Sequence, residues 1–397
     1  MLLFLILLLT EVLTFVVLRQ HLLKDSKTLY NITILLNSLL SIWLWIIYIK
    51  YSSHRSFYDS PDHVWLQMAL SGMICSVVLP RMIVIVFHFI GRLINLIRLR
   101  KNVHLKWLTN TGFVFGTIIL VITLGGVLIG KHNFKYNNVS LAMSNLHPDL
   151  ENFRIVHISD LHLASFYHSS EKLESVMQKI TGLNPDLIVN SGDFITFGWR
   201  EFGRNDTILS IARARYGKIA VMGNHDEGIY NPDFTEADLT NNKLIINNLV
   251  SQSGYLMLQN ESASLIVGNS KISITGVRTG GRYPHIIHAN LDTVLKGADS
   301  ADFHILITHD PNQWINEVAG KRKDVELTLS GHTHGMQMGI MTKRFKWSPA
   351  QYIYPNWDGL YENDNQFQYV NRGLGVLAIP FRIWMPPEIT VITLKGE

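Results

Sequence analysis

The amino-acid sequence predicts an α-helical transmembrane region followed by an α/β domain. Apolar runs long enough to cross a bilayer occupy the first third of the 397 residues and end near Lys131. Beyond that point, short β-rich runs alternate with helical patterns up to the C-terminus. We therefore expect a transmembrane region at residues 1–130, a linker and the start of the domain at 131–152, and one α/β domain at 153–397.

The composition favours a membrane protein and disfavours a nucleic-acid-binding or disulfide-rich one. Hydrophobic residues make up 47% of the chain, which favours membrane spans, and the formal net charge is only +4. Because this charge is small and no basic stripe interleaved with aromatic residues follows the apolar third, no nucleic-acid partner is expected. The single Cys75 excludes an internal disulfide framework.

Four apolar runs match the length of about 20 residues that a helix needs to cross the hydrocarbon core. They cover residues 2–18, 32–49, 65–89 and 113–129. Pro80 and Arg81 interrupt the third run, which favours one kinked span with an amphipathic extension to Ile97; two short spans, five in all, are the alternative. We expect Glu11 and Arg81 to make contacts between helices, because a charge facing lipid is costly; a substrate or proton path is the alternative.

Basic residues in short loops predict which side of the membrane each loop occupies, because such loops favour the cytoplasmic side. They are concentrated in the loops after the first and third spans, which are Arg19, Lys24, Lys27, Arg92, Arg98, Arg100, Lys101 and Lys106. Only Lys131 and Lys135 follow the last span closely. We therefore expect a multi-pass protein of the cytoplasmic (inner) membrane, with its domain on the outer, periplasmic or extracellular, side.

The remaining chain reads as one α/β domain. Its predicted strands are 153–158, 187–189, 219–222, 265–267, 272–274, 303–307, 325–329 and 389–394, and two of its predicted helices are 170–180 and 240–251. Five of these strands end in Asp, Asn or His. Open α/β sheets place ligand sites at the carboxyl ends of their strands, so we expect these side chains to form one site.

The potential metal ligands at the strand ends are Asp160, His162, Asp193, Asn224, His309, His332 and His334. Each fragment alone is also typical of a helix N-cap, a turn or a packed histidine. Together they supply more donors than the four that one tetrahedral zinc needs, and none is a thiolate. If one carboxylate bridges, each of two ions receives four contacts and keeps open positions, as in two-metal hydrolases that act on phosphoryl groups. Mixed nitrogen and oxygen donors suit Mn, Fe or Zn.

In this order, the blocks resemble the calcineurin-like metallophosphoesterases. The family pattern DxH, GD, GNH(D/E), H, GHxH is matched by Asp160-His162, Gly192-Asp193, Gly223 to Asp226, His309, and Gly331 to His334. The resemblance covers the chain from about Phe153 onward and implies a β-sandwich flanked by helices.

The resemblance also implies a role for each residue. Asp160, His162 and His334 would bind one divalent ion, Asn224, His309 and His332 the other, and Asp193 would bridge them. His225 would act as general acid or electrostatic stabiliser of the phosphoryl group. Asp226 would either orient His225 or cap a helix, and both residues are candidate catalytic residues.

The C-terminal segments 358–361, 370–375 and 386–389, with Arg382, resemble the membrane-associated branch of this family. That likeness implies hydrolysis of a phosphoester or pyrophosphate by attack of a metal-bound hydroxide. It also makes a lipid-linked substrate one of the expected substrate classes. One alternative is a pyrophosphatase of the UDP-2,3-diacylglucosamine type, which an outward-facing domain disfavours. The other is a non-catalytic membrane binding protein.

Two further stretches each allow a functional and a purely structural interpretation. Lys343, Arg344 and Lys346 precede an aromatic-rich stretch and would contact membrane lipids, or form the solvated edge of a packed loop. The segment from Phe197 to Arg200 would line the substrate cleft, or close a loop.

Overall fold

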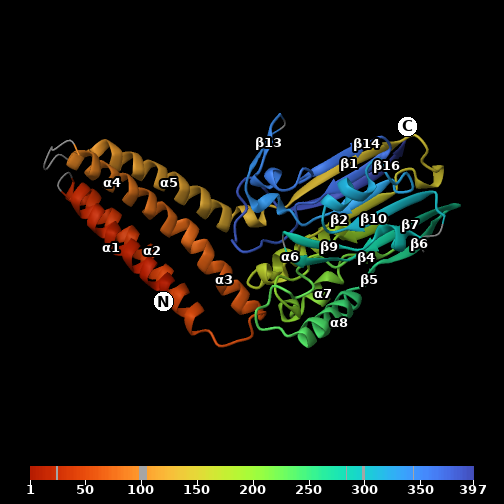
Figure 1. The fold of residues 1–397 in the computed structure, drawn as a ribbon, viewed down its shortest axis with the longest axis horizontal. Helices are drawn as coiled ribbons and strands as arrows, with labels where there is room; N and C mark the ends of the chain where they lie inside the picture. The colour runs from red at the N-terminus through yellow and green to blue at the C-terminus, as the bar shows by residue number, and fades with distance from the viewer. Residues whose placement is uncertain (24–25, 98–104, 283, 297–299, 343) are drawn as a thin grey trace. The chain divides into compact units, whose positions relative to one another are not determined.

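The chain forms two compact units (Figure 1). The computed structural model describes residues 1–397 except 24–25, 98–104, 283, 297–299 and 343, so that Lys24, Arg98, Arg100, Lys101 and Lys343 lie outside the described residues. The first unit contains Met1–Arg55, Leu66–Leu128 and Ala378–Phe381, and the second contains Ser56–Trp65, Ile129–Leu377 and Arg382–Glu397. The segments Ser56–Trp65 and Ala378–Phe381 thus group with a different unit from their neighbours in the sequence.

The first unit is helical. Its helices are α1 (Leu2–Leu22), α2 (Lys27–Ser53), α3 (Pro61–Met73), α4 (Leu79–Ile97) and α5 (Lys106–Leu128). A π-helical stretch, Ile74–Val78, joins α3 to α4, so one helix of 37 residues runs from Pro61 to Ile97. The wider π turn accommodates Pro80, which lacks the N–H that an α-helix would use. Within the described residues, four helices are long and apolar enough to cross a membrane, as predicted.

Polar side chains inside these helices contact one another. Trp45 Nε1 donates to Glu11 Oε2 at 2.7 Å, and this bond joins α1 to α2. Arg81 donates from Nε to Asn37 Oδ1 at 3.0 Å and from Nη2 to Ser41 Oγ at 2.7 Å. The expected inter-helix contacts of Glu11 and Arg81 are therefore confirmed.

The second unit contains two six-stranded sheets. The first has the order β1 (Lys135–Met143), β16 (Glu388–Gly396), β2 (Arg154–Ile158), β3 (Leu187–Asn190), β4 (Lys218–Ala220), β5 (Tyr255–Met257). The second has the order β14 (Gly359–Asn363), β15 (Gln366–Val370), β11 (Leu327–Ser330), β10 (Phe303–Thr308), β7 (Ser270–Val277), β6 (Glu261–Val267). Two hairpins are β8 (Thr279–Arg282) with β9 (His285–His288), and β12 (Ile340–Met341) with β13 (Lys346–Trp347).

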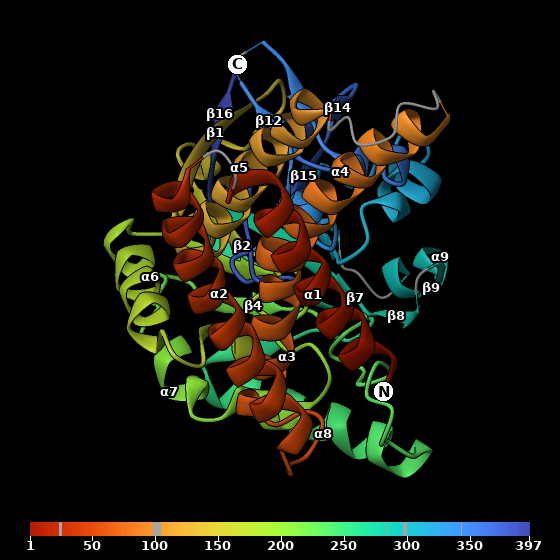
Figure 2. The ribbon, with the colours of Figure 1, turned by 90° about the vertical axis from the view of Figure 1, so that its left-hand side faces the viewer.

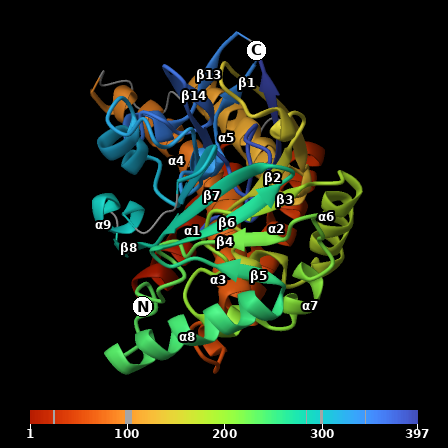
Figure 3. The same cartoon turned by 90° about the vertical axis from the view of Figure 1, so that its right-hand side faces the viewer.

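Alternating side chains of each strand face different cores, because successive residues of a strand point to opposite faces. Ile155 of β2 and Ile305 of β10 belong to the buried cluster shared by the two sheets. Val156 instead packs in a cluster with residues of α6 (Ser170–Gly182), α7 (Asn205–Leu209) and α8 (Glu236–Gln252). Leu306 packs with α9 (Leu291–Leu295) and the π-helix Trp314–Val318. Figures 2 and 3 show α6 and α9 on opposite sides of the sheets, which confirms the sandwich flanked by helices.

Parallel pairing brings the ends of the strands together. Ile158 pairs with Asn190 and Asn190 with Ala220, so β2, β3 and β4 end at one edge of the first sheet. Ile307 pairs with Leu329 in the second sheet, where β10 and β11 are also parallel. The polar residues that follow these strands therefore start from neighbouring positions.

Strand β1 lies inside the region expected to be a linker. It pairs in parallel with β16 over its whole length, from Lys135 opposite Glu388 to Met143 opposite Gly396. Only Leu141 and Met143 are buried in this edge strand, which explains why the sequence shows no clear apolar run there.

Candidate metal centre

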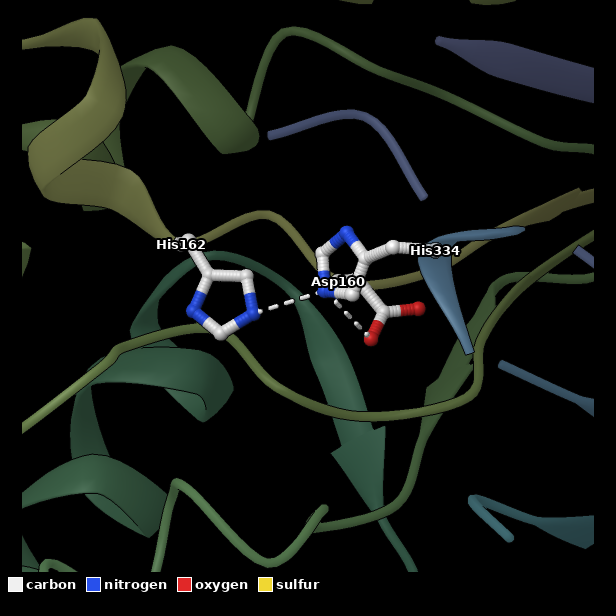
Figure 4. A group of neighbouring side chains, drawn as sticks. All are labelled: Asp160, His162 and His334. Atoms are coloured by element: carbon white, nitrogen blue, oxygen red, sulfur yellow. Dashed lines mark hydrogen bonds and ion pairs between the residues drawn. The ribbon is translucent and has the colours of Figure 1, made fainter. Parts of the chain in front are cut away.

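Six of the seven predicted ligands gather into two clusters. In each cluster, every residue offers one possible ligand atom, a carboxylate oxygen or a ring nitrogen, and these atoms all lie within 4.8 Å of one another. The first cluster is Asp160, His162 and His334 (Figure 4), and the second is Asp193, His309 and His332. Their composition of nitrogen and oxygen donors suits a divalent transition metal.

Two carboxylates connect the clusters. Asp193 Oδ2 lies 2.9 Å from His309 Nε2 in its own cluster and 3.9 Å from His162 Nε2 in the other. Asp160 Oδ1 lies 3.2 Å from His334 Nε2 and 3.9 Å from His309 Nε2. The clusters are therefore neighbours, and Asp193 Oδ2 lies within 4 Å of a ring nitrogen in each of them.

Asn224, the seventh predicted ligand, presents a free oxygen. Its Nδ2 donates to Tyr230 Oη at 2.9 Å, whereas its Oδ1 is buried without a hydrogen-bond partner among the described residues. In His309, Nδ1 hydrogen-bonds to Ser191 O at 2.8 Å, and Nε2 faces Asp193 Oδ2 at 2.9 Å. A buried acceptor with no partner is costly unless a ligand satisfies it, so the residues present fit divalent ions.

His225 lies beside the clusters and belongs to neither. Its Nδ1 hydrogen-bonds to Thr196 O at 2.8 Å, which places a proton on Nδ1 and leaves Nε2 free. The ring stacks on Tyr230 with centroids 4.2 Å apart and meets the ring of His162 at 5.1 Å. Burial lowers the pKa of His225, which favours the neutral ring in the absence of an anion.

Asp226 has neither of its two expected roles. Its Oδ2 accepts from the backbone N–H groups of Asp193 at 2.9 Å and Gly223 at 3.0 Å, and its Oδ1 accepts from those of Phe194 and Ile195. The carboxylate thus joins the loop after β3 to the loop after β4. The Asp226 side chain does not contact the His225 ring, and it does not start a helix. We infer that Asp226 positions these two loops and takes no direct part in catalysis.

Five of the six cluster residues have a left-handed backbone. They are Asp160 (φ 50°), His162 (φ 38°), Asp193 (φ 59°), His332 (φ 72°) and His334 (φ 50°). This conformation costs a residue other than glycine about 1–2 kcal/mol. Such strain persists where the surrounding structure imposes it, and it is typical of functional sites.

Glycines of the motifs leave room for the two carboxylates. A Cβ atom on Gly223 would collide with Asp193 Oδ1, and one on Gly331 would collide with Asp160 Oδ2 and Ser159 Oγ. Both glycines are therefore required for close packing of the loops around the clusters.

The clusters are electrostatically coupled. Burial raises the pKa of Asp193, but the rings of His309 and His225 outweigh it and hold this pKa well below the ordinary value. Burial would lower the pKa of His309, yet Asp193 and Asp160 raise it to about 10. Asp193 is therefore ionised, as a metal ligand must be, whereas His309 would release its Nε2 proton when a metal ion binds.

Several residues that touch the predicted ligands were not identified from the sequence. Thr196 Oγ1 lies 3.0 Å from His162 Nδ1, and Tyr354 Oη lies 2.9 Å from His332 Nε2. Arg382, singled out only as part of the C-terminal pattern, is buried and donates to the carbonyl oxygen of His334. No spacing rule connects these residues to the motifs, because their contacts arise from loops far apart in the chain.

The basic residues after the GHxH block differ in their surroundings. Lys346 Nζ pairs with Asp358 Oδ2 at 2.9 Å, whereas Arg344 is exposed. Exposed aromatic rings of Phe345 and Tyr352 lie in the same part of the chain. Contact with membrane lipids stays a prediction for this stretch.

Comparison with known proteins finds relatives that are metallophosphoesterases or a pyrophosphatase. The family described as calcineurin-like phosphoesterase matches residues 153–336. The metallophosphoesterase YkuE of Bacillus subtilis is 30% identical over 275 residues, which cover 67% of this chain and 87% of that protein. The transmembrane protein with metallophosphoesterase domain of Danio rerio is 27% identical over 70% of this chain and 61% of its own length. The UDP-2,3-diacylglucosamine pyrophosphatase LpxG of Chlamydia trachomatis is 28% identical over 62% of this chain and 85% of its own length.

Proposed function

Because this chain belongs to the calcineurin-like phosphoesterase family, whose members hydrolyse phosphoester bonds, we propose that its second unit is a dinuclear-metal phosphoesterase anchored by the four apolar helices. The observation that carries this proposal is the position of Asp193, which lies within 4 Å of a ring nitrogen in each cluster. In this proposal Asp160, His162 and His334 would hold the first ion, Asn224, His309 and His332 would hold the second, and Asp193 would be shared between them.

The protein's own residues would position the substrate and move a proton. When bound, two divalent ions would neutralise phosphoryl oxygens and lower the pKa of a water molecule. His225 keeps Nε2 free, because Nδ1 is fixed on Thr196 O. A phosphate anion near this ring would raise its pKa and favour the imidazolium, whose Nε2–H can donate to the phosphoryl group or to the leaving oxygen. Tyr230 supports this role by holding both the His225 ring and the Asn224 amide.

The test uses the full-length chain purified in detergent. We expect Mn²⁺ to stimulate cleavage of bis(4-nitrophenyl) phosphate, and a chelator to abolish it. Absence of metal-stimulated cleavage with this diester, with mononucleotides and with a lipid pyrophosphate would leave the alternative, a binding protein with a non-catalytic metal site.

A second candidate is cleavage of a glycolipid pyrophosphate, which is favoured by the likeness to LpxG and by the apolar helices. Turnover of the pyrophosphate in total lipid extracts, compared with turnover of the aryl diester, distinguishes the two. Release of a phosphorylated glycolipid from the extract at a rate well above diester cleavage would favour the second candidate, and no release would exclude it.

A further inference from the structure

A segment between two membrane helices packs as part of the catalytic unit. Residues 56–65, here called the 56–65 segment, follow α2 and include the start of α3, yet their contacts place them in the second unit. A loop that only connects two spans would be solvated. Asp59 is instead completely buried, with 0% of its surface exposed.

The partners of this segment are Phe197 to Arg200. Arg200 Nη1 pairs with Asp59 Oδ1 at 3.0 Å, and the backbone N–H of Arg200 donates to Asp59 Oδ2. The Arg200 guanidinium also lies 3.8 Å from the centre of the Phe57 ring, and the Tyr58 ring meets that of Phe197 at 4.8 Å. The Asp59 carboxylate sits so close to Gly198 that a Cβ atom there would collide with it.

The contacted loop, residues 196–201, holds the candidate general acid. Thr196 O accepts from His225 Nδ1 at 2.8 Å and so sets the orientation of that ring. Glu201 fixes the same loop from inside by accepting from the backbone N–H groups of Thr196 and Gly198. Asp59 fixes it from outside, through Arg200. The loop thus connects Asp59 to His225 by hydrogen bonds and backbone alone.

We propose that Asp59 is a positioning residue for catalysis, which acts through Arg200 and Thr196 on the orientation of His225. This inference rests on the proposed function, because His225 has its role only if the unit hydrolyses a phosphoester. The connection between α2 and α3 then does more than link two helices, since it supplies a residue that the catalytic loop needs.

The experiment measures kcat and KM of full-length variants with bis(4-nitrophenyl) phosphate and Mn²⁺. We expect Asp59→Ala to lower kcat about 10-fold or more with little change in KM, because a displaced catalytic group loses rate even when binding is intact. Arg200→Ala should give a similar loss, and the double variant should be no worse than either single one. Arg200 lies nearer the surface, so its variant tests the same connection if Asp59→Ala does not fold.

Dependence on His225 separates positioning from general damage. In a His225→Ala background, we expect Asp59→Ala to change kcat by less than about 2-fold, because the ring that it positions is already absent. Metal content should match that of the wild type in all these variants. The control Glu151→Ala removes an exposed ion pair with Lys395 and should leave kcat unchanged.

Three results would overturn the inference. The first is an unchanged kcat for Asp59→Ala and Arg200→Ala in an active enzyme, and the second is a full 10-fold loss in the His225→Ala background. The third is loss of metal from Asp59→Ala, which would mean that the loop acts through His162. If the wild-type chain itself is inactive, the proposed function fails and this inference fails with it.

Discussion

At the scale of single residues, the candidate site depends on hydrogen bonds that occupy one atom of a side chain and direct another atom toward the clusters. Ser191 occupies Nδ1 of His309, Tyr230 occupies the amide nitrogen of Asn224, and Thr196 occupies Nδ1 of His225. Each bond fixes which atom of the side chain faces a ligand, and such supporting partners commonly change metal affinity or activity 10–100-fold when removed.

Asp193→Asn tests the bridging position. We expect the variant to lose both ions and at least about 100-fold of its turnover, because a neutral amide replaces the carboxylate that lies near both clusters. Metal analysis of the purified protein and diester cleavage measure the two effects. Asp324→Asn, at an exposed position, is the control, and retention of one full equivalent of metal in Asp193→Asn would contradict a bridge.

His225→Ala tests the separation of metal binding from proton transfer. We expect near-normal metal content and a turnover that falls about 100-fold or more, since the ring belongs to neither cluster and general acid catalysis contributes at least about that much. Loss of both ions would refute its assignment as a residue that does not bind metal.

At the scale of elements, the site is held together by loops that follow parallel strands. Asp226 connects two of these loops through four backbone N–H groups and is fully buried. Its importance therefore lies in loop geometry, although it stands directly beside His225 in the chain.

Asp226→Ala should destabilise the catalytic unit by about 3 kcal/mol or more, because each buried donor left without an acceptor costs about 1–3 kcal/mol. Thermal unfolding of the metal-free protein measures this effect. The matched variant Asp238→Ala removes an exposed helix-capping carboxylate and should cost about 1 kcal/mol. Equal losses in the two variants would show that Asp226 does not hold the loops.

The sequence predicts these elements unevenly, for physical reasons. Buried strands such as 303–308 have continuous apolar runs, and the polar residues at their ends are adjacent in the chain, so both are visible in the sequence. Strand β1 is missed because an edge strand needs few buried side chains. The Asp226 hydrogen bonds and the left-handed backbone at His332 are missed because tertiary packing imposes them against local preference.

At the scale of the whole molecule, the 56–65 segment constrains the topology. It follows the second apolar helix, whereas the rest of its unit follows the fourth. Two parts of one packed unit must lie on the same side of a membrane, which requires an even number of crossings between them. Two candidate spans, Pro61–Ile97 and Lys106–His132, lie between the two parts, and two is an even number. Dividing Pro61–Ile97 into two spans, as the five-span alternative does, would give three crossings and would not meet the condition.

Labelling of introduced cysteines tests the side of the membrane. In a Cys75→Ser background, Phe57→Cys and Leu244→Cys place a thiol at two exposed positions, one in each part of the second unit. With the domain outside the cytoplasmic membrane, as the basic loops predict, a membrane-impermeant maleimide should label both in intact cells. Labelling only after permeabilisation would reverse the orientation, and labelling of one position alone would contradict the span count.

The buried Asp59 also has a consequence for biosynthesis. Ribosomes complete the 56–65 segment before they have made any of residues 129–397, so the segment must wait, unpaired, until Arg200 has been translated and has reached the same side. Folding of the catalytic unit can finish only after the last helix has been inserted. We therefore expect insertion of the four apolar helices to precede completion of the active-site loop.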